Sequence, residues 1–206
     1  WDTPCIFNII SWFILNIDQG ISISGSKKKG SYFINLFKFI NKMGHKLNDN
    51  TVKGSKKNIE EHYDISNDFY HTFLDKSMTY SCALFDSEKK DLEEAQRDKY
   101  LSLATKLKIK PTDHVLEIGT GWGGLSLLLV KEFGCKVTTI TISKEQFEYA
   151  KELHKREGVD DKIELKLMDY RKLQGNYDKI ISIEMLEAVG HKCYDTFFKK
   201  INEVLS

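Results

Sequence analysis

Residues 113–124 read Asp-His-Val-Leu-Glu-Ile-Gly-Thr-Gly-Trp-Gly-Gly. The first half has the apolar composition of a buried strand, and the second half is a glycine-dense turn. A helical pattern from Leu125 to Phe133 follows without a break. A strand, a tight turn and a helix in this order direct backbone N–H groups at whatever lies over the carboxyl end of the strand. The stretch therefore predicts an α/β fold with a ligand site at this turn.

Three glycines of the turn, Gly119, Gly121 and Gly123, alternate with other residues and follow an acidic one. Glycine leaves no side chain to hold a ligand away from the backbone. This spacing looks like the cofactor loop of S-adenosylmethionine-dependent methyltransferases. The turn also matches the dinucleotide pattern G-x-G-x-x-G, with Gly124 as its last glycine, but such a match alone is weak. A ribose-binding acid is expected at the tip of the second strand, whereas Glu145 falls inside the next helix. A dinucleotide site therefore ranks second, and a turn that serves only packing ranks third.

The chain after residue 110 alternates between strand and helix patterns. Strands are predicted at residues 115–118, 137–142, 163–167 and 179–184, with helical patterns between them that include residues 147–156, and a last amphipathic helix is predicted at 194–205. Strands that alternate with helices of this length imply right-handed crossovers and a parallel sheet. We therefore predict an α/β fold of the class I methyltransferase type, Rossmann-like but incomplete, whose fourth strand is an open edge.

The composition is typical of a soluble globular domain with a sizeable core, because 41% of the 206 residues are hydrophobic and 30% are charged. The net charge of +1 gives no overall field that would attract nucleic acid. Charge is uneven, however, since residues 1–60 hold nine lysines and only four acidic residues. This basic arm indicates an anionic surface as partner. The four cysteines are widely spaced, which predicts reduced thiols in the cytoplasm rather than disulfides or a zinc site.

Residues 1–58 are predicted to form a helical, basic amphipathic arm with polar linkers, ahead of a methyltransferase domain at 59–206. The apolar stretch at 5–17 is shorter than the roughly 20 residues that span a bilayer, and it lacks the features of a secretory signal. An apolar stripe at 33–43 is flanked by lysines, which is typical of a helix that lies in a lipid headgroup layer. The same patterns also fit helices that pack on protein, and the stretch at 5–17 also fits the tail of a longer upstream region, so peripheral membrane association is one of several interpretations of the arm.

Five sequence blocks occur in order along the predicted domain. They are His-Tyr-Asp-Ile-Ser-Asn-Asp-Phe-Tyr at 62–70, Met-Thr-Tyr-Ser-Cys-Ala-Leu-Phe at 78–85, Leu-Glu-Glu-Ala-Gln at 92–96, Met-Asp-Tyr-Arg at 168–171 and Ser-Ile-Glu-Met-Leu-Glu-Ala-Val-Gly-His at 182–191. Together with the glycine turn, this series resembles the cyclopropane-fatty-acyl-phospholipid synthases over residues 59–206. The combination is far more specific than any single block, and residues 1–58 show no such match.

The resemblance implies a reaction. Members of this family transfer a methyl group from S-adenosylmethionine to a cis double bond in a phospholipid acyl chain, the added group loses a proton, and a cyclopropane ring closes. A bound bicarbonate is the implied proton acceptor. The protein would hold both reactants in line and exclude water from a carbocation. The implied partners are phospholipid acyl chains at a membrane surface and no nucleic acid. The oligomeric state stays open, with a homodimer as one option.

The resemblance also implies site residues. The cofactor-binding positions match Tyr80, Ser81, Gly119, Gly121, Thr141, Gln146, Asp169 and Tyr170. The catalytic positions around the bicarbonate match Cys82, Ile183 and Glu187, and no metal is implied.

Each of these positions also has a purely structural interpretation. Ser143-x-x-Gln146 is a capping box as well. Cys82 is of a type that is often a small buried hydrophobe. Glu187 suits a helix cap or a salt bridge, and Asp169 suits a cap of the turn after the third strand. The two tyrosines suit core aromatics with a bonded hydroxyl. The blocks favour the functional interpretation because they occur together and in order.

Some features depart from the family pattern. Thr120 and Ala188 stand where Cys and, in bacterial members, His are common. The His and Tyr that complete the bicarbonate site, and the remaining strands of the sheet, would follow residue 206 in the family, so we expect a C-terminally truncated chain. It begins with Trp1 rather than Met, as a fragment or processed product would. Alternative functions are methyl transfer to small-molecule amines, an incomplete domain that acts as a membrane-surface binding module, and a dinucleotide-dependent oxidoreductase.

Overall fold

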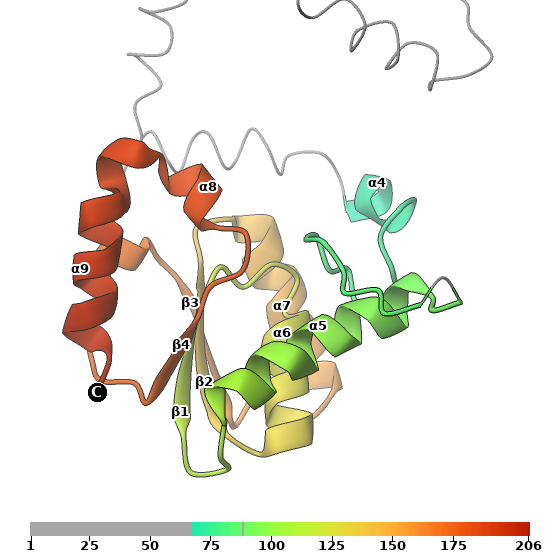
Figure 1. The fold of residues 1–206 in the computed structure, drawn as a ribbon, viewed down its shortest axis with the longest axis horizontal. Helices are drawn as coiled ribbons and strands as arrows, with labels where there is room; N and C mark the ends of the chain where they lie inside the picture. The colour runs from blue at the N-terminus through green and yellow to red at the C-terminus, as the bar shows by residue number, and fades with distance from the viewer. Residues whose placement is uncertain (1–66, 88) are drawn as a thin grey trace, which may run out of the picture. The chain divides into compact units, whose positions relative to one another are not determined.

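The predicted strand, turn and helix form at the glycine-rich stretch. In the computed structural model, which describes residues 67–87 and 89–206, strand β1 (His114–Ile118) leads into the turn and helix α6 (Gly124–Leu128) follows it (Figure 1). The helix continues directly into the π-helical turn η1 (Leu129–Phe133), which completes the helical pattern predicted as far as Phe133. The arm predicted for residues 1–58 lies outside the described residues and stays a prediction.

Within residues 67–87 and 89–206, four parallel strands form the sheet, in the order β3-β2-β1-β4. Besides β1, their bounds are Lys136–Thr141 for β2, Ile163–Leu167 for β3 and Lys179–Ile181 for β4. Val115 of β1 is paired with Val137 of β2 on one side and with Lys179 of β4 on the other. The two inner strands are almost entirely buried, as expected for parallel strands covered on both faces. Within the described residues β4 is an edge strand, which confirms that part of the prediction.

Strand β4 is shorter than the sequence predicted. The expected strand ran over 179–184, but the pairing with β1 ends at Ile181. The chain then bends, and Glu184 adopts φ 46, in the left-handed region that favours glycine. Ser182 Oγ donates to the Ile118 carbonyl oxygen at 3.0 Å, which keeps the bent segment beside the end of β1. The apolar pattern could not locate this bend because the bend depends on tertiary contacts.

Helices cover both faces of the sheet (Figure 1). Helices α5 (Leu92–Leu107), α6 and α7 (Lys144–Arg156) lie on one face, and α9 (Tyr194–Val204) lies on the other. Successive side chains of β1 point to opposite faces. Val115 therefore joins a core cluster with residues of α5 and α6, whereas Leu116 joins a second cluster with residues of α9. This arrangement matches the predicted α/β class.

Short elements lie between the main ones. They are α4 (Asn67–His71), the 3₁₀ turns η2 (Tyr170–Lys172) and η3 (His191–Cys193), and α8 (Leu186–Val189). Trp122 of the glycine turn donates from Nε1 to Asn67 Oδ1 at 2.9 Å, so α4 is tied to that turn. None of the helices in the described part of the chain is long and apolar enough to cross a lipid bilayer.

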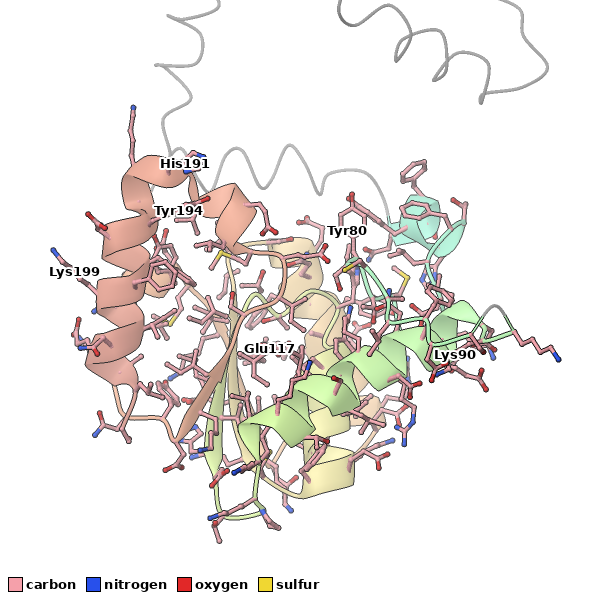
Figure 2. The ribbon with its side chains drawn as sticks, in the orientation of Figure 1. Tyr80, Lys90, Glu117, His191, Tyr194 and Lys199 are labelled. Carbon is pink, nitrogen blue, oxygen red and sulfur yellow. The ribbon has the colours of Figure 1, made fainter. Side chains whose placement is uncertain are left out.

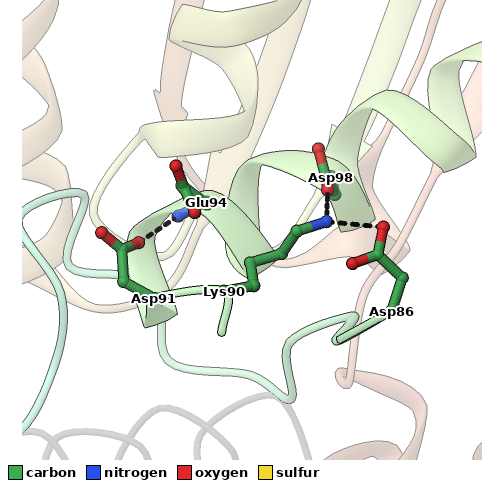
Figure 3. Close-up of polar contacts among 5 residues, drawn as sticks. All are labelled: Asp86, Lys90, Asp91, Glu94 and Asp98. Carbon is green, nitrogen blue, oxygen red and sulfur yellow. Dashed lines mark hydrogen bonds and ion pairs between the residues drawn. The ribbon is translucent and has the colours of Figure 1, made fainter. Parts of the chain in front are cut away.

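The start of α5 is fixed by acidic side chains (Figure 3). Asp91 is the N-cap, and its Oδ1 accepts from the Glu94 backbone N–H at 2.8 Å. The Lys90 ammonium pairs with Asp86 at 2.7 Å and also with Asp98. The Leu84 N–H donates to the Ala95 carbonyl oxygen at 3.1 Å. These contacts anchor the preceding loop, which carries the Tyr-Ser-Cys block, onto the helix.

Candidate functional site

The glycines of the turn have different surroundings. Gly119, Gly121 and Gly123 have φ values of 101, 54 and 90, which residues other than glycine rarely adopt. A Cβ on Gly121 would meet nothing within 4 Å, so the backbone there faces open space. A Cβ on Gly123 would lie 3.0 Å from Ala150 Cβ and 2.8 Å from His154 Nε2 of α7. The expectation that Gly123 leaves room for a ligand is therefore wrong, because its missing side chain lets the turn pack on α7.

A cavity of about 970 Å³ lies over the carboxyl ends of β1, β2 and β4. Every residue selected from the sequence lines it: Tyr80, Ser81, Cys82, Gly119, Gly121, Thr141, Gln146, Asp169, Tyr170, Ile183 and Glu187. These residues come from five separate stretches of the chain. Ligands of parallel α/β sheets bind at this edge of the strands. The structure brings the selected residues together, whereas the role of each stays a prediction.

Thr141 and Gln146 form a buried polar pair at the end of β2. Thr141 Oγ1 donates to Gln146 Oε1 at 2.8 Å and accepts from the Ser143 N–H at 3.1 Å. Ser143 is the N-cap of α7, and its Oγ accepts from the Gln146 N–H at 3.3 Å. Half of the predicted capping box is therefore present. The Gln146 side chain bonds to Thr141 rather than back to the cap, which leaves its amide NH₂ group as the available donor beside the cavity.

Asp169 and Tyr170 follow β3. Asp169 Oδ1 accepts from the Arg171 backbone N–H and, at 2.8 Å, from Arg171 Nε, while Oδ2 pairs with Arg171 Nη2 at 2.6 Å. Burial opposes ionisation of Asp169, but the hydrogen bonds and charge of Arg171 outweigh it and lower the pKa of the carboxyl. The predicted cap is thus present. The buried Tyr170 hydroxyl has no hydrogen-bond partner among the described residues, and burial raises its pKa.

Tyr80 and Cys82 are not buried core residues. Tyr80 is 44% exposed, and its ring packs edge-on against Tyr70 with centroids 5.3 Å apart. Cys82 is exposed as well. Both side chains line the cavity, and Figure 2 shows Tyr80 close to α4. The structural interpretations of these two residues as a core aromatic and a buried hydrophobe are therefore wrong.

Two residues of α5 hold the loop that carries this block. Gln96 Nε2 donates to the carbonyl oxygens of Thr79 at 3.3 Å and Ser81 at 2.7 Å. Lys99 Nζ donates to Gln96 Oε1 at 2.6 Å and also to Ser81 Oγ. Lys99 is only 9% exposed, and burial lowers the pKa of its ammonium group. Because Ser81 Oγ accepts from Lys99, its own hydrogen is directed elsewhere, so Ser81 is available to the cavity as a donor.

Glu117 places a carboxyl group between the apolar residues Leu116 and Ile118 of strand β1 (Figure 2). It is 3% exposed and lines the cavity. Burial raises its pKa to about 8, although hydrogen bonds from Thr139 and Ser126 oppose the shift. Its Oε2 has no hydrogen-bond partner among the described residues. An unpaired buried polar atom is costly, so this oxygen is a natural contact for a ligand group. Glu117 is the acidic residue that precedes the alternating glycines in the sequence pattern, but the sequence did not assign it a role in the site.

Glu184 was also missed. Its Oε1 accepts from the Cys82 backbone N–H at 2.8 Å, and both residues line the cavity. The hydrogen bond and charge of Glu184 raise the pKa of the Cys82 thiol. Glu187, in α8, is a second exposed carboxylate on the same cavity. The sequence placed Glu184 in a recognised block but gave no sign of its partner. Within the described ranges, no group of three or more His, Cys, Asp or Glu could hold a metal ion.

Comparisons with known proteins identify the family of this chain. Residues 50–206 match the protein family described as mycolic acid cyclopropane synthetase. A probable fatty acid methyltransferase of Pseudomonas putida is 42% identical over 145 residues, which are 69% of this chain and 37% of that protein. The cyclopropane-fatty-acyl-phospholipid synthase of Escherichia coli strain K12 is 41% identical over 146 residues, which are 71% of this chain and 37% of that protein.

A solved structure is similar in both sequence and fold. The mycolic acid cyclopropane synthase CmaA1, crystallised in complex with SAH and CTAB, is 32% identical with a TM-score of 0.71. The similarity covers 73% of this chain and 53% of that one. The chain thus spans between a third and two fifths of the two curated relatives above, and about half of this solved structure.

Proposed function

Because the chain belongs to the mycolic acid cyclopropane synthetase family, we propose that it transfers a methyl group from S-adenosylmethionine to the cis double bond of an unsaturated phospholipid acyl chain, and that a cyclopropane ring then closes. The observation that carries the proposal is the gathering of all the selected residues around one cavity at the carboxyl ends of the strands. A relative that is named as a phospholipid cyclopropane synthase supports the lipid substrate.

The residues of the cavity fit S-adenosylmethionine. Gly121 faces open space, so its backbone can approach the amino-acid part of the cofactor. The unpartnered Glu117 Oε2 suits an ammonium group, which would make the charge-assisted bond that the structure lacks there. The amide of Gln146 can donate to a ribose hydroxyl, and Tyr170 offers its hydroxyl beside the expected adenine position. When bound, the cofactor supplies an electrophilic methyl group on a positively charged sulfur.

The apolar part of the lining suits an acyl chain. Apolar side chains line the cavity, among them Phe73, Leu74, Leu92, Met185 and Val189. Phe73 is 47% exposed, and its ring centroid lies 6.3 Å from that of Tyr80. Such a surface excludes water from a carbocation, and an aromatic face attracts a positive charge. A substrate of this kind also implies peripheral contact with a membrane surface. Retention of the protein on phospholipid vesicles in co-sedimentation tests that implication.

Bicarbonate does not fit the residues around Cys82. The resemblance implied Cys82, Ile183 and Glu187 around this anion. The Cys82 backbone N–H, however, already donates to the Glu184 carboxylate, and Glu187 lines the same cavity. The N–H that would bind the anion is therefore occupied by a carboxylate, and the cation that acts on Glu184, Lys99, is already held by Gln96 and Ser81. No step of the proposed reaction runs through bicarbonate.

Methyl transfer to an amine is a second candidate, since one specific observation favours it. Glu184 and Glu187 place two carboxylates on the cavity, and a carboxylate can bind an ammonium group or take a proton from it. The apolar lining and the phospholipid-modifying relative favour the acyl chain instead.

The experiment that tests the proposal uses the purified protein with S-adenosylmethionine and vesicles of phospholipid with cis-unsaturated acyl chains. Mass spectrometry of the hydrolysed lipid should show the gain of one methylene group on unsaturated chains and none on matched saturated chains. A parallel reaction with small tertiary-amine precursors tests the second candidate. Methylation of amines without any change in the acyl chains would overturn the lipid assignment.

A further inference from the structure

The backbone of Glu184 adopts a conformation that is unfavourable for residues other than glycine. Glu184 follows the end of β4 and has φ 46, a value that glycine adopts freely and other L-residues rarely adopt. Backbone strain of this kind persists where the surrounding structure holds it, often at functional sites. The neighbouring turn uses glycine at its left-handed positions, and Met78 is the other non-glycine residue with positive φ that lines the cavity in the described part of the chain. A carboxylate in place of glycine here is therefore a feature to explain.

The Glu184 carboxylate is held at the cavity by a partner far along the chain. Its Oε1 accepts from the Cys82 backbone N–H at 2.8 Å, across a sequence separation of 102 residues. The bond joins the loop before α5 to the loop after β4, and both residues are exposed and line the cavity. The carboxylate is thus oriented by the protein and remains within reach of a molecule that enters the cavity.

The surroundings of Glu184 favour its charged form. The hydrogen bonds with Cys82 lower its pKa, and the charge of Lys99 acts in the same direction, although burial opposes both. Lys99 is itself nearly buried and held in place by Gln96 and Ser81. Glu184 is therefore an anion at neutral pH, which is the state that can accept a proton.

We propose that Glu184 is the proton acceptor of ring closure and that its carboxylate performs the role that the resemblance gave to a bound bicarbonate. This inference rests on the proposed function. The π electrons of the cis double bond form a bond to the methyl carbon, and the pair of the broken S–C bond stays on sulfur. The positive charge then lies on the neighbouring acyl carbon. Glu184 removes one proton from the added methyl group, and the C–H electron pair forms the second C–C bond of the ring. The carboxylic acid returns its proton to water.

Two substitutions separate this chemistry from a structural role. Glu184→Gln keeps a side-chain oxygen that can accept from the Cys82 N–H, but an amide does not take a proton. Glu184→Gly suits the left-handed backbone and leaves the Cys82 N–H open to an external anion. Glu203→Gln is the matched control, because Glu203 is an exposed acid of α9 that pairs with Lys200 and does not line the cavity.

The first measurement follows products from unsaturated phospholipid vesicles in bicarbonate-free buffer. We expect wild type and Glu203→Gln to form the ring, with no stimulation by added bicarbonate. Glu184→Gln should form the ring about a hundredfold more slowly, the range that a general base contributes, and should release acyclic methylated chains instead. Glu184→Gly should be equally slow without bicarbonate and should recover when it is added. Ring formation by Glu184→Gln at the wild-type rate would overturn the inference.

The second measurement does not depend on activity. Carbon-13 NMR of labelled bicarbonate, with the protein loaded with S-adenosylhomocysteine, should show no binding to wild type and saturable binding to Glu184→Gly. Saturable binding to wild type would overturn the inference even if the lipid is modified. The proposed function fails separately, and only if wild type adds no methyl group to acyl chains.

Discussion

At the scale of single residues, Glu117 makes the stability of the fold depend on pH. Its carboxyl has an ordinary pKa of 4.5, and burial in β1 raises the pKa to about 8 in the folded chain. Between these two values the unfolded chain releases the proton while the folded chain keeps it. The folded state therefore loses stability as the pH rises through this window, by up to about 1.4 kcal/mol per pH unit. Below pH 4.5 the carboxyl is protonated in both states, so the fold loses none of this stability there.

Glu117→Gln should remove this dependence because an amide does not titrate. We expect the free energy of unfolding of wild type, measured with urea at intervals across the window, to fall with rising pH. The variant should show a flatter profile, with the difference between the two proteins narrowing toward the acidic end. Parallel profiles would contradict the assignment. We also expect S-adenosylhomocysteine to release the Glu117 proton when it binds, because its ammonium group would lie beside Oε2 of this carboxyl.

At the scale of secondary structure, α5 ends on a residue that glycine would suit better. Lys108 is its C-cap and has φ 53, with its N–H bonded to the last turn of the helix. Lys108→Gly should raise the free energy of unfolding by about 0.5–1 kcal/mol, because it relieves a left-handed conformation. Lys106→Gly, inside the helix and also exposed, should instead destabilise the protein. Thermal unfolding of both variants checks the pair, and an equal loss in both would contradict the capping argument.

Elements with a strong periodic pattern were predictable from the sequence. The helices α7 and α9 lie within a few residues of their predicted ranges because their apolar stripes meet the sheet directly. The end of β4 was predicted incorrectly, since the bend at Glu184 depends on contacts that no local pattern contains. The same holds for Gly123, whose need for glycine comes from the close approach of α7. Local sequence indicates that a turn is tight, but it does not say which neighbour makes it tight.

At the scale of the whole molecule, the site is assembled from segments that are distant in sequence. The chemical types of its residues were predictable from blocks in a recognised order, and the parallel sheet explains why strand ends bring them to one edge. The contacts between the segments were not predictable. The bond from Cys82 to Glu184 and the support of Ser81 by Lys99 both join different parts of the fold. These contacts decide which carboxylate is oriented and which hydroxyl can donate, so they shape the chemistry more than the blocks do.

A ligand that touches all these segments should stabilise the folded chain as a whole. Binding to the folded state alone adds about 2.7 kcal/mol at roughly a hundredfold excess of free ligand over its Kd. We expect S-adenosylhomocysteine to raise the unfolding temperature of wild type accordingly. Gly121→Val places a branched side chain in the open space of the turn, so it should abolish that rise. Gly123→Ala should instead lower the unfolding temperature without ligand, because its Cβ meets Ala150 and His154. Equal behaviour of the two variants would contradict the assignment of Gly121 to the cavity and of Gly123 to the packing of the turn on α7.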